Sequence, residues 1–319
     1  MTTINVEKSA SVYMPSKGMR LDQICAQLFN DYSRSRLQAW IAQGQLTLNG
    51  EQASQRDLVK HQDALVLNAN LVLDPGVRAE DIALDIVYED DALIVVNKPA
   101  GLVVHPGAGN TSGTLVNALL HYAPELDALP RAGLVHRIDK DTTGLLVVAR
   151  TLESHSYLVE ALQAREINRE YEAVVRGQLV AGGTIDKPIE RDPRDRTKMA
   201  IRQGGRESVT HYRVLERFKS HTRLRLKLET GRTHQIRIHM ASEKHPLVGD
   251  PVYGGRLAIP AGTSASLEQM LRGFNRQALH ARRLGLIHPV SGERMDWQVA
   301  PPEDMQRLVA SLREDMSAE

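Results

Sequence analysis

The sequence predicts an α+β protein with two domains: a small N-terminal domain and a larger one built around a mixed, largely antiparallel sheet. Three observations lead to this class. The chain has 319 residues, which is long enough for two domains and a sizeable core. Its content of 42% hydrophobic and 25% charged residues is typical of a soluble globular protein. Beyond residue 84, strand-like and helical segments follow one another irregularly, without the regular alternation of a doubly wound fold.

The first domain is expected at residues 18–70. A helix is predicted near its start because apolar side chains recur at helical spacing on one face. These residues are Leu21, Ile24, Cys25, Leu28 and Phe29.

A second helix and a hairpin complete the first domain. The helix is predicted to begin at Ser33, a residue type that caps helix N-termini, and to end at Gly44. The chain then alternates between polar and apolar residues around an Asn49-Gly50 pair, which is a strong signal for a hairpin turn. An acidic segment follows, and it indicates a linker at residues 71–84.

The second domain is expected at residues 85–319. Its first part reads as a hairpin over 84–99, and residues 145–149 read as a buried strand. Helical spacing predicts helices within 114–122 and 151–167 and a short helix at 233–242, and alternation predicts strands within 169–177, 207–218 and 221–230.

Cysteine use and hydropathy bear on the compartment. A single cysteine, Cys25, excludes an internal disulfide and a cysteine-rich zinc site. The N-terminal residues lack an apolar stretch of signal-peptide length, and no apolar run is long enough to cross a bilayer. We therefore expect a cytoplasmic protein that does not span a membrane.

The charge is close to neutral overall but unevenly distributed. The formal net charge is +1, yet residues 191–240 contain 14 Lys or Arg against 5 Asp or Glu. Residues 74–91 contain 7 acidic residues and one Arg. Such segregation can present a basic face to nucleic acid, although it also occurs in ordinary solvated surfaces.

The segment 132–150, AGLVHRIDKDTTGLLVVAR, places two carboxylates and two cations directly before the predicted strand 145–149. One interpretation is the D-x-D-x-T signature of a phosphatase, formed by Asp139, Asp141 and Thr143. In such enzymes an apolar strand runs directly into the first aspartate and a helix follows. Here His136 and Arg137 interrupt the lead-in and a strand follows, which argues against this function.

A second interpretation makes Asp139 a functional anion. A desolvated carboxylate acts as a nucleophile or base when a guanidinium keeps it ionised and oriented. Arg137 is two residues away, and the segment TGRTHQIRIHM supplies Arg232 and Arg237. The alternative is a structural ion pair that ties a loop to a helix.

The histidines do not indicate a metal site. His221, His234, His239 and His245 lie within 25 residues, but their spacing matches no common zinc pattern, and no cysteine is near. His234 and His239 also lie about 140° apart around a helix, so they do not face one ligand.

Three motifs resemble those of the RluA-type pseudouridine synthases. GLVHRIDKDTTGLLVVA resembles the family's catalytic motif, REYEAVVRG its second motif and LRLKLETGRTHQIRIHMASEKHPLVGDPVYGG its third. Residues 18–68 are similar to the S4-type RNA-binding domain that many members carry. The resemblance covers about residues 18–300, and it is greatest to a branch that modifies large-subunit ribosomal RNA. Ile138 and Thr143 depart from the residues common in the family, and neither change affects the carboxylate chemistry.

The resemblance implies a function and roles for catalytic residues. The protein would isomerise specific uridines of 23S ribosomal RNA, several of them in one stem-loop, after flipping each base out of the RNA. Asp139 would be the catalytic aspartate, Tyr171 would stack on the uracil and assist proton transfer, and Arg237 would pair with Asp139. No cofactor and no metal are expected, because the reaction is neither a redox reaction nor a hydrolysis.

The resemblance also implies contacts with RNA. Arg137 would contact a phosphate or fill the space left by the flipped nucleotide, and Arg232 would bind RNA nearby. Lys98 and His105 would approach the RNA backbone, although a loop lysine is more often simply solvated. In the first domain, Arg34 and Arg36 follow a predicted helix N-terminus, where backbone N–H groups also favour a phosphate.

The expected partner is large-subunit ribosomal RNA or the pre-ribosomal large subunit, bound by a monomer. Two other functions stay open at this point: a non-catalytic RNA-binding factor of ribosome assembly, and the phosphatase. An assembly factor that had lost the reaction would be expected to lack Asp139 or Arg237, and both are present.

Overall fold

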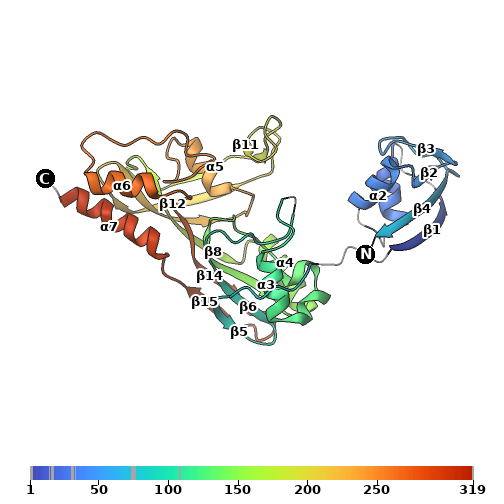
Figure 1. The fold of residues 1–319 in the computed structure, drawn as a ribbon, viewed down its shortest axis with the longest axis horizontal. Helices are drawn as coiled ribbons and strands as arrows, with labels where there is room; N and C mark the ends of the chain where they lie inside the picture. The colour runs from blue at the N-terminus through green and yellow to red at the C-terminus, as the bar shows by residue number, and fades with distance from the viewer. Residues whose placement is uncertain are drawn as a thin grey trace. The chain divides into compact units, whose positions relative to one another are not determined.

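The computed structural model describes residues 3–13, 15, 18–29, 32, 34–72, 77–107 and 109–317 (Figure 1). Contacts between Cα atoms divide the chain into two compact units, residues 1–76 and 77–319. We call them the N-terminal unit and the larger unit. Both contain helices and strands, so the α+β class is confirmed.

The N-terminal unit combines two helices with a four-stranded antiparallel sheet of order β1-β4-β2-β3. Its elements are β1 (Thr3–Ser11), α1 (Leu21–Leu28), α2 (Arg34–Ala42), β2 (Leu46–Leu48), β3 (Glu51–Gln52) and β4 (Ala64–Val72). The predicted hairpin is confirmed, because Thr47 pairs with Gln52 across the turn and both Asn49 and Gly50 have positive φ. The predicted cap Ser33 lies outside the described residues.

The apolar face predicted for α1 is confirmed at all but one position. Leu21, Ile24, Cys25 and Phe29 are buried, but Leu28 is 39% exposed. The helix ends at Leu28, and the N–H of Phe29 donates to the carbonyl of Cys25. The chain therefore turns after Leu28 and brings Phe29 into the core in its place. Strand β1, which pairs with β4 along its whole length, was not predicted.

The larger unit is built on a mixed sheet of nine strands. Its order is β5-β6-β7-β14-β8-β13-β12-β9, with β15 paired to β14. Among the strand pairs of this sheet in the described residues, only β7–β14 is parallel, which agrees with the predicted largely antiparallel sheet. The strands are β5 (Ile86–Glu89), β6 (Leu93–Lys98), β7 (Thr143–Ala149), β8 (Asn168–Arg176), β9 (Gly183–Asp186), β12 (Val209–Arg217), β13 (His221–Leu228), β14 (Leu279–Ile287) and β15 (Arg294–Gln298).

Helices pack on the sheet and a separate hairpin extends from it. The helices are α3 (Leu115–Tyr122), α4 (Leu152–Gln163), α5 (Gln235–Ser242), α6 (Ala265–Gly273) and α7 (Glu303–Ser317), with short 3₁₀ turns at Pro124–Ala128 and Pro130–Gly133. The hairpin consists of β10 (Ile189–Arg191) and β11 (Met199–Ile201). In Figure 1, α6 and α7 lie side by side, and α3 and α4 lie near β6.

The two faces of the sheet carry different cores because side chains alternate along each strand. On β7, Leu146 and Val148 join the core that contains α3 and α5, whereas Leu145 and Val147 join the core that contains α4. All seven residues of β7 are buried. This explains the uninterrupted apolar run at 145–149, which is typical of a strand covered on both faces.

The parallel pair β7–β14 approaches closely where β7 begins. Gly144 has a φ of 109°, and a Cβ atom built there would lie 2.2 Å from the carbonyl oxygen of Ala281. Glycine is therefore required at this position. The close approach holds the start of β7, and with it the charged segment 134–142, against the centre of the sheet.

Candidate active site

The segment 134–142 folds back along β7 and presents Asp139 at the entrance to the strand. Leu134 forms a bridge with Val148, and the imidazole Nε2 of His136 accepts a hydrogen bond from the N–H of Val147 at 3.2 Å. The N–H of Thr142 donates to the carbonyl of Asp139 at 3.1 Å and closes a turn. Backbone and side chain together therefore fix the direction of the Asp139 carboxylate. We call this segment the Asp139 loop.

Arg237 of α5 meets this carboxylate. Its Nη1 donates to Oδ2 of Asp139 at 3.0 Å, and its Nε and Nη2 donate to the two oxygens of Asp250 at 2.7 and 2.9 Å. Arg237 is 4% exposed. Burial disfavours its charge, but the Asp250 hydrogen bonds and the charge of Asp139 outweigh this and raise the pKa of Arg237. The guanidinium thus stays charged between two carboxylates.

Asp250 anchors Arg237 from the side opposite Asp139. It is buried and also accepts hydrogen bonds from the N–H groups of Val252 and Tyr253. Burial alone would raise the pKa of this carboxyl. The hydrogen bonds from Arg237 and the two N–H groups lower it by more than burial raises it, so the pKa of Asp250 lies below its ordinary value. The sequence analysis did not identify Asp250, although it lies in the segment HPLVGDPVYGG of the third motif.

His234 and Tyr253 lie beside the same pair. Nε2 of His234 is 4.0 Å from Oδ1 of Asp139, and Nδ1 lies 2.9 Å from the Tyr253 hydroxyl. The Tyr253 ring also lies 5.2 Å from the centre of the Arg237 guanidinium. Burial lowers the pKa of His234, which favours the neutral imidazole. The sequence analysis rejected His234 as a metal ligand and predicted neither of these contacts.

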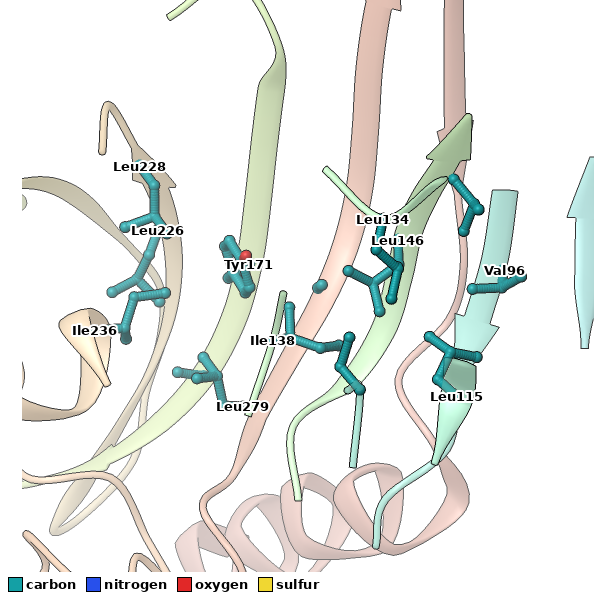
Figure 2. Close-up of a cluster of buried hydrophobic side chains, with 14 of the residues drawn as sticks. Val96, Leu115, Leu134, Ile138, Leu146, Tyr171, Leu226, Leu228, Ile236 and Leu279 are labelled. Atoms are coloured by element: carbon teal, nitrogen blue, oxygen red, sulfur yellow. The ribbon is translucent and has the colours of Figure 1, made fainter. Parts of the chain in front are cut away.

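Tyr171 lies on β8 and lines the same cavity as Asp139. Its side chain is 6% exposed, and burial raises the pKa of its phenol. In Figure 2 the ring lies between two aliphatic groups: Leu226 and Leu228 of β13, and Leu134, Ile138 and Leu146 of the Asp139 loop and β7. Apolar contacts thus hold the ring in place at the wall of the cavity.

Two adjoining hollows make up the site. The inner cavity contains the acid–guanidinium pair, and among its lining residues are Asp139, Tyr171, His234 and Arg237. The outer groove has a volume of about 840 Å³, and among its lining residues are His105, Arg131, Arg165 and Glu229. Arg137, Arg169, Gly231 and Arg232 line both. The outer groove has room for a charged polymer, and the inner cavity that adjoins it is smaller, with a volume of about 50 Å³.

The predicted RNA contacts of the larger unit lie at different places. Arg137, Arg232 and His105 line the groove, and Arg137 and His105 are exposed. Lys98 is instead 1% exposed, and its Nζ donates to the carbonyls of Pro99, Leu102 and Lys140 at 2.6–2.9 Å. Burial lowers the pKa of Lys98 to about 7. Because Nζ is buried against these three carbonyls, Lys98 does not reach an RNA backbone. It holds the Asp139 loop by the carbonyl of Lys140.

In the N-terminal unit, Arg34 binds a buried carboxylate. Asp22 is fully buried and accepts hydrogen bonds from the side chains of Arg20, Arg34 and Gln38. The hydrogen bond from Arg20 is the largest influence and lowers the pKa of Asp22. The side chain of Arg34 is 49% exposed, so it keeps an open edge, and Arg36 is half-buried. Asp22 thus orients the guanidinium of Arg34.

The described residues contain neither an evident metal site nor a membrane-spanning helix. Within the parts of the chain that the structure describes, no group of three or more His, Cys, Asp or Glu residues is arranged to hold a metal ion. None of the helices in those parts is long and apolar enough to cross a membrane.

Comparison with known proteins places these features in a family. The sequence profile of RNA pseudouridylate synthases matches residues 92–242, and that of the S4 domain matches residues 19–65. The chain is 55% identical over 313 residues to a ribosomal large subunit pseudouridine synthase D of Pseudomonas aeruginosa, with 98% of each sequence covered. It is 54% identical over 311 residues to the protein of the same name from Yersinia pestis, covering 97% of this chain and 96% of that protein.

The fold also has solved counterparts. Human RNA Pseudouridylate Synthase Domain Containing 4 superposes with a TM-score of 0.56 at 26% identity, covering 72% of this chain and 93% of the human chain. Human RNA Pseudouridylate Synthase Domain Containing 1 gives a TM-score of 0.53 at 25% identity, covering 76% and 98%.

Proposed function

The chain belongs to the RNA pseudouridylate synthase family and is an isomerase, and we propose that it acts on uridines of 23S ribosomal RNA through Asp139. The observation that supports this most is the Asp139–Arg237 pair at 3.0 Å in a cavity shared with Tyr171. The relatives with more than 50% identity are named as large-subunit enzymes, which supports the choice of RNA.

The reaction moves the bond between uracil and ribose from N1 to C5. The bond between C1′ and N1 breaks, the base turns, C5 bonds to C1′, the hydrogen on C5 leaves as a proton, and N1 takes up a proton in its place. The product is an isomer, so neither electrons nor water need to be supplied. A paired or stacked base is out of reach, and flipping it out of the RNA brings it to the inner cavity.

Asp139 has two routes open to it. Its carboxylate either attacks C1′ as a nucleophile or removes a ribose proton so that a glycal forms. Both routes need an ionised carboxylate with one free oxygen. Arg237 binds Oδ2, whereas Oδ1 lies on the side of His234, 4.0 Å from its Nε2, and is open to the substrate.

The other side chains bind and present the nucleotide. The fixed ring of Tyr171 supports the flipped uracil by stacking, and its phenol is placed to help proton transfer at the base. Arg137, exposed between groove and cavity, contacts a phosphate or occupies the space left by the base. Arg232 and His105 contact the RNA backbone along the groove.

The two domains have different functions, RNA binding and catalysis. Residues 18–70 dock on structured RNA as an S4-type domain through Arg34 and Arg36, residues 71–84 link the domains, and residues 85–319 carry out the reaction. The enzyme acts in the cytoplasm as a monomer on large-subunit RNA or its precursor particle. Several uridines of one stem-loop are modified.

The proposal is tested by mapping pseudouridine in 23S ribosomal RNA isolated from cells that lack the gene. Purified protein added to this RNA should restore pseudouridine at a small set of uridines within one stem-loop. If the protein binds the RNA but forms no pseudouridine, on naked RNA or on the precursor particle, the assembly-factor function is correct instead. If the sites form but are scattered over many stems, the single stem-loop is wrong.

A further inference from the structure

Arg169 is a buried arginine without an ionic partner. It lies on β8, is 7% exposed, and its Nε has no hydrogen-bond partner. Among the described residues, none of the recorded ion pairs and hydrogen bonds involves its guanidinium. A buried charge is normally paired, because desolvation makes an unpaired one costly.

Other buried or half-buried arginines of the larger unit are paired with carboxylates. Arg237 lies between Asp139 and Asp250, Arg223 binds Glu172, and Arg276 binds Asp304. The side chains of these arginines are between 5% and 24% exposed, and each has a carboxylate oxygen within 3.0 Å. Arg169 has comparable burial and no such oxygen. An unpaired charge in a ready-made cavity indicates that its partner arrives with the substrate.

The guanidinium of Arg169 lies where the groove meets the inner cavity. It lines both, together with Arg137 and Arg232. A Cβ atom built on Gly231 would lie 2.6 Å from its Nη1, so the guanidinium sits directly against the Gly231 backbone. Glycine at this position leaves the space that the guanidinium occupies.

Arg169 also shares a strand face with Tyr171. Residues i and i+2 of a strand point to the same side, about 7 Å apart. Burial raises the pKa of the Tyr171 phenol, and the charge of Arg169 acts in the opposite direction, as expected for neighbours. A base stacked on the Tyr171 ring therefore has one edge toward the Arg169 guanidinium and its sugar toward Asp139.

We propose that Arg169 is a catalytic residue that donates hydrogen bonds to a carbonyl oxygen of the flipped uracil and balances the charge of the departing base. This rests on the proposed function. When the bond between C1′ and N1 breaks, its electron pair stays on uracil and spreads onto the ring oxygens. Arg169 stays protonated throughout. The negative charge on uracil is used up when C5 bonds to C1′, after which C5 releases its proton and N1 takes one up. Donors aimed at developing charge in a dry site are strong catalytic elements.

A phosphate is the less suitable partner for Arg169. The groove already offers cations of greater exposure to the RNA backbone, such as Arg137 and Arg165. Arg169 lies deeper, on the strand that carries Tyr171. The base is the part of the nucleotide that reaches this depth, and its carbonyl oxygens match the planar donors of a guanidinium.

The test compares Arg169→Met and Arg169→Lys with the native protein, using 23S ribosomal RNA tritiated at C5 of uridine. Single-turnover release of tritium at saturating protein, the Kd for RNA at several salt concentrations, and Tm are measured. Arg169→Met should release tritium about 10²–10³-fold more slowly, as when one donor to a developing charge is removed. Its Kd should stay within about twofold of the native value, and its Tm should rise because an unpaired buried charge is lost.

Arg169→Lys keeps the charge but not the planar fork, so its rate should fall between those of the native protein and Arg169→Met. Arg223→Met is the matched control. It breaks a paired arginine away from the inner cavity, so Tm should fall while the saturating rate is kept.

Three results would overturn the inference. Arg169→Met would instead identify a phosphate contact if it bound RNA more weakly but released tritium at the native rate at saturating protein. The slope of the logarithm of affinity against the logarithm of salt concentration would then fall by about one. Unchanged rate and affinity in both variants would show that Arg169 takes no part. A fall in Tm like that of Arg223→Met would show that the charge is paired in the protein. If the native protein releases no tritium, the proposed function fails, independently of Arg169.

Discussion

The guanidinium Nη1 of Arg237 lies 3.0 Å from Oδ2 of Asp139, although the two residues are 98 positions apart in the chain. Asp250 holds the other edge of the same guanidinium in a bidentate contact. Asp139 therefore meets a cation that is fixed before any substrate arrives, so that little reorganisation is needed in the reaction.

Replacing Arg237 should damage both stability and catalysis. Arg237→Met leaves Asp250 buried without its cation, so the free energy of unfolding should fall by about 3–5 kcal/mol, the range for breaking a buried pair. Tritium release should fall to background in the fraction that stays folded. Urea denaturation and the release assay measure the two effects. Arg313→Met, which breaks an exposed pair with Glu216, is the control and should alter neither appreciably.

Asp250→Asn should change the response of stability to acid. The pKa of Asp250 lies below its ordinary value in the folded protein, so its contribution is complete above pH 3.8. The contribution is lost as the pH falls from there through the folded pKa, because the unfolded chain then binds the extra proton. The native protein should thus lose more stability than Asp250→Asn below pH 3.8. If the free energy of unfolding fell equally with pH in the two proteins, Asp250 would not be the source of this acid sensitivity.

Tyr171→Phe separates the ring from its hydroxyl. The ring alone provides stacking, so Tyr171→Phe should keep its Kd for RNA and its Tm close to the native values. If Tyr171→Phe releases tritium more slowly than the native protein at saturating concentrations, the phenol takes part in proton transfer. Tyr171→Leu should weaken capture of the flipped base and lower the rate further. A Tyr171→Leu protein with native activity would remove Tyr171 from the site.

Lys98→Met tests the anchor of the Asp139 loop. The variant loses three hydrogen bonds, one of them to the Lys140 carbonyl beside Asp139, and leaves these carbonyls buried. The saturating rate should fall by about 10–100-fold, a loss typical of small displacements of a catalytic group. The Kd for RNA should hardly change, because Lys98 does not face the groove. A weaker Kd with a native rate would restore the RNA contact first expected for Lys98.

The S4-type unit should control affinity rather than turnover. Replacing Arg34 and Arg36 by Ala should weaken RNA binding and lower the salt slope by up to about two, since each phosphate contact contributes slightly less than one. Turnover at saturating RNA should be largely unchanged. If turnover at saturating RNA is lost while the Tm of the variant is unchanged, this unit helps to build the active site.

Local patterns in the sequence predicted much of the fold and part of the site. The buried run at 145–149, the Asn49-Gly50 hairpin and the short helix at 233–242 depend on neighbouring residues, and all three are present. The strands β1 and β14 were missed because their pairing partners are distant: β1 pairs with β4, and β14 lies between β7 and β8. Exposure of Leu28 follows from where α1 ends, which periodicity does not set.

In the active site, too, some residues were predicted from the sequence and others were missed. The need of a buried carboxylate for a cation left Arg137, Arg232 and Arg237 as candidates. The family resemblance selected Arg237, and this residue is in contact with Asp139. Asp250, His234 and Tyr253 were not identified, because their roles depend on how α5 and the segment after it fold around Arg237. Lys98 was placed on the surface because lysines usually are, and only the three carbonyls around it reveal its burial.

The most direct test of the account compares the native protein with Asp139→Asn on 23S ribosomal RNA tritiated at C5 of uridine. The substitution keeps the size of the side chain and one acceptor oxygen, but it removes the charge and replaces the other oxygen by an NH2 donor. Tritium should reach water with the native protein and stay at background with Asp139→Asn, while both bind the RNA with similar Kd. Equal release by the two proteins would show that another group breaks the bond between uracil and ribose.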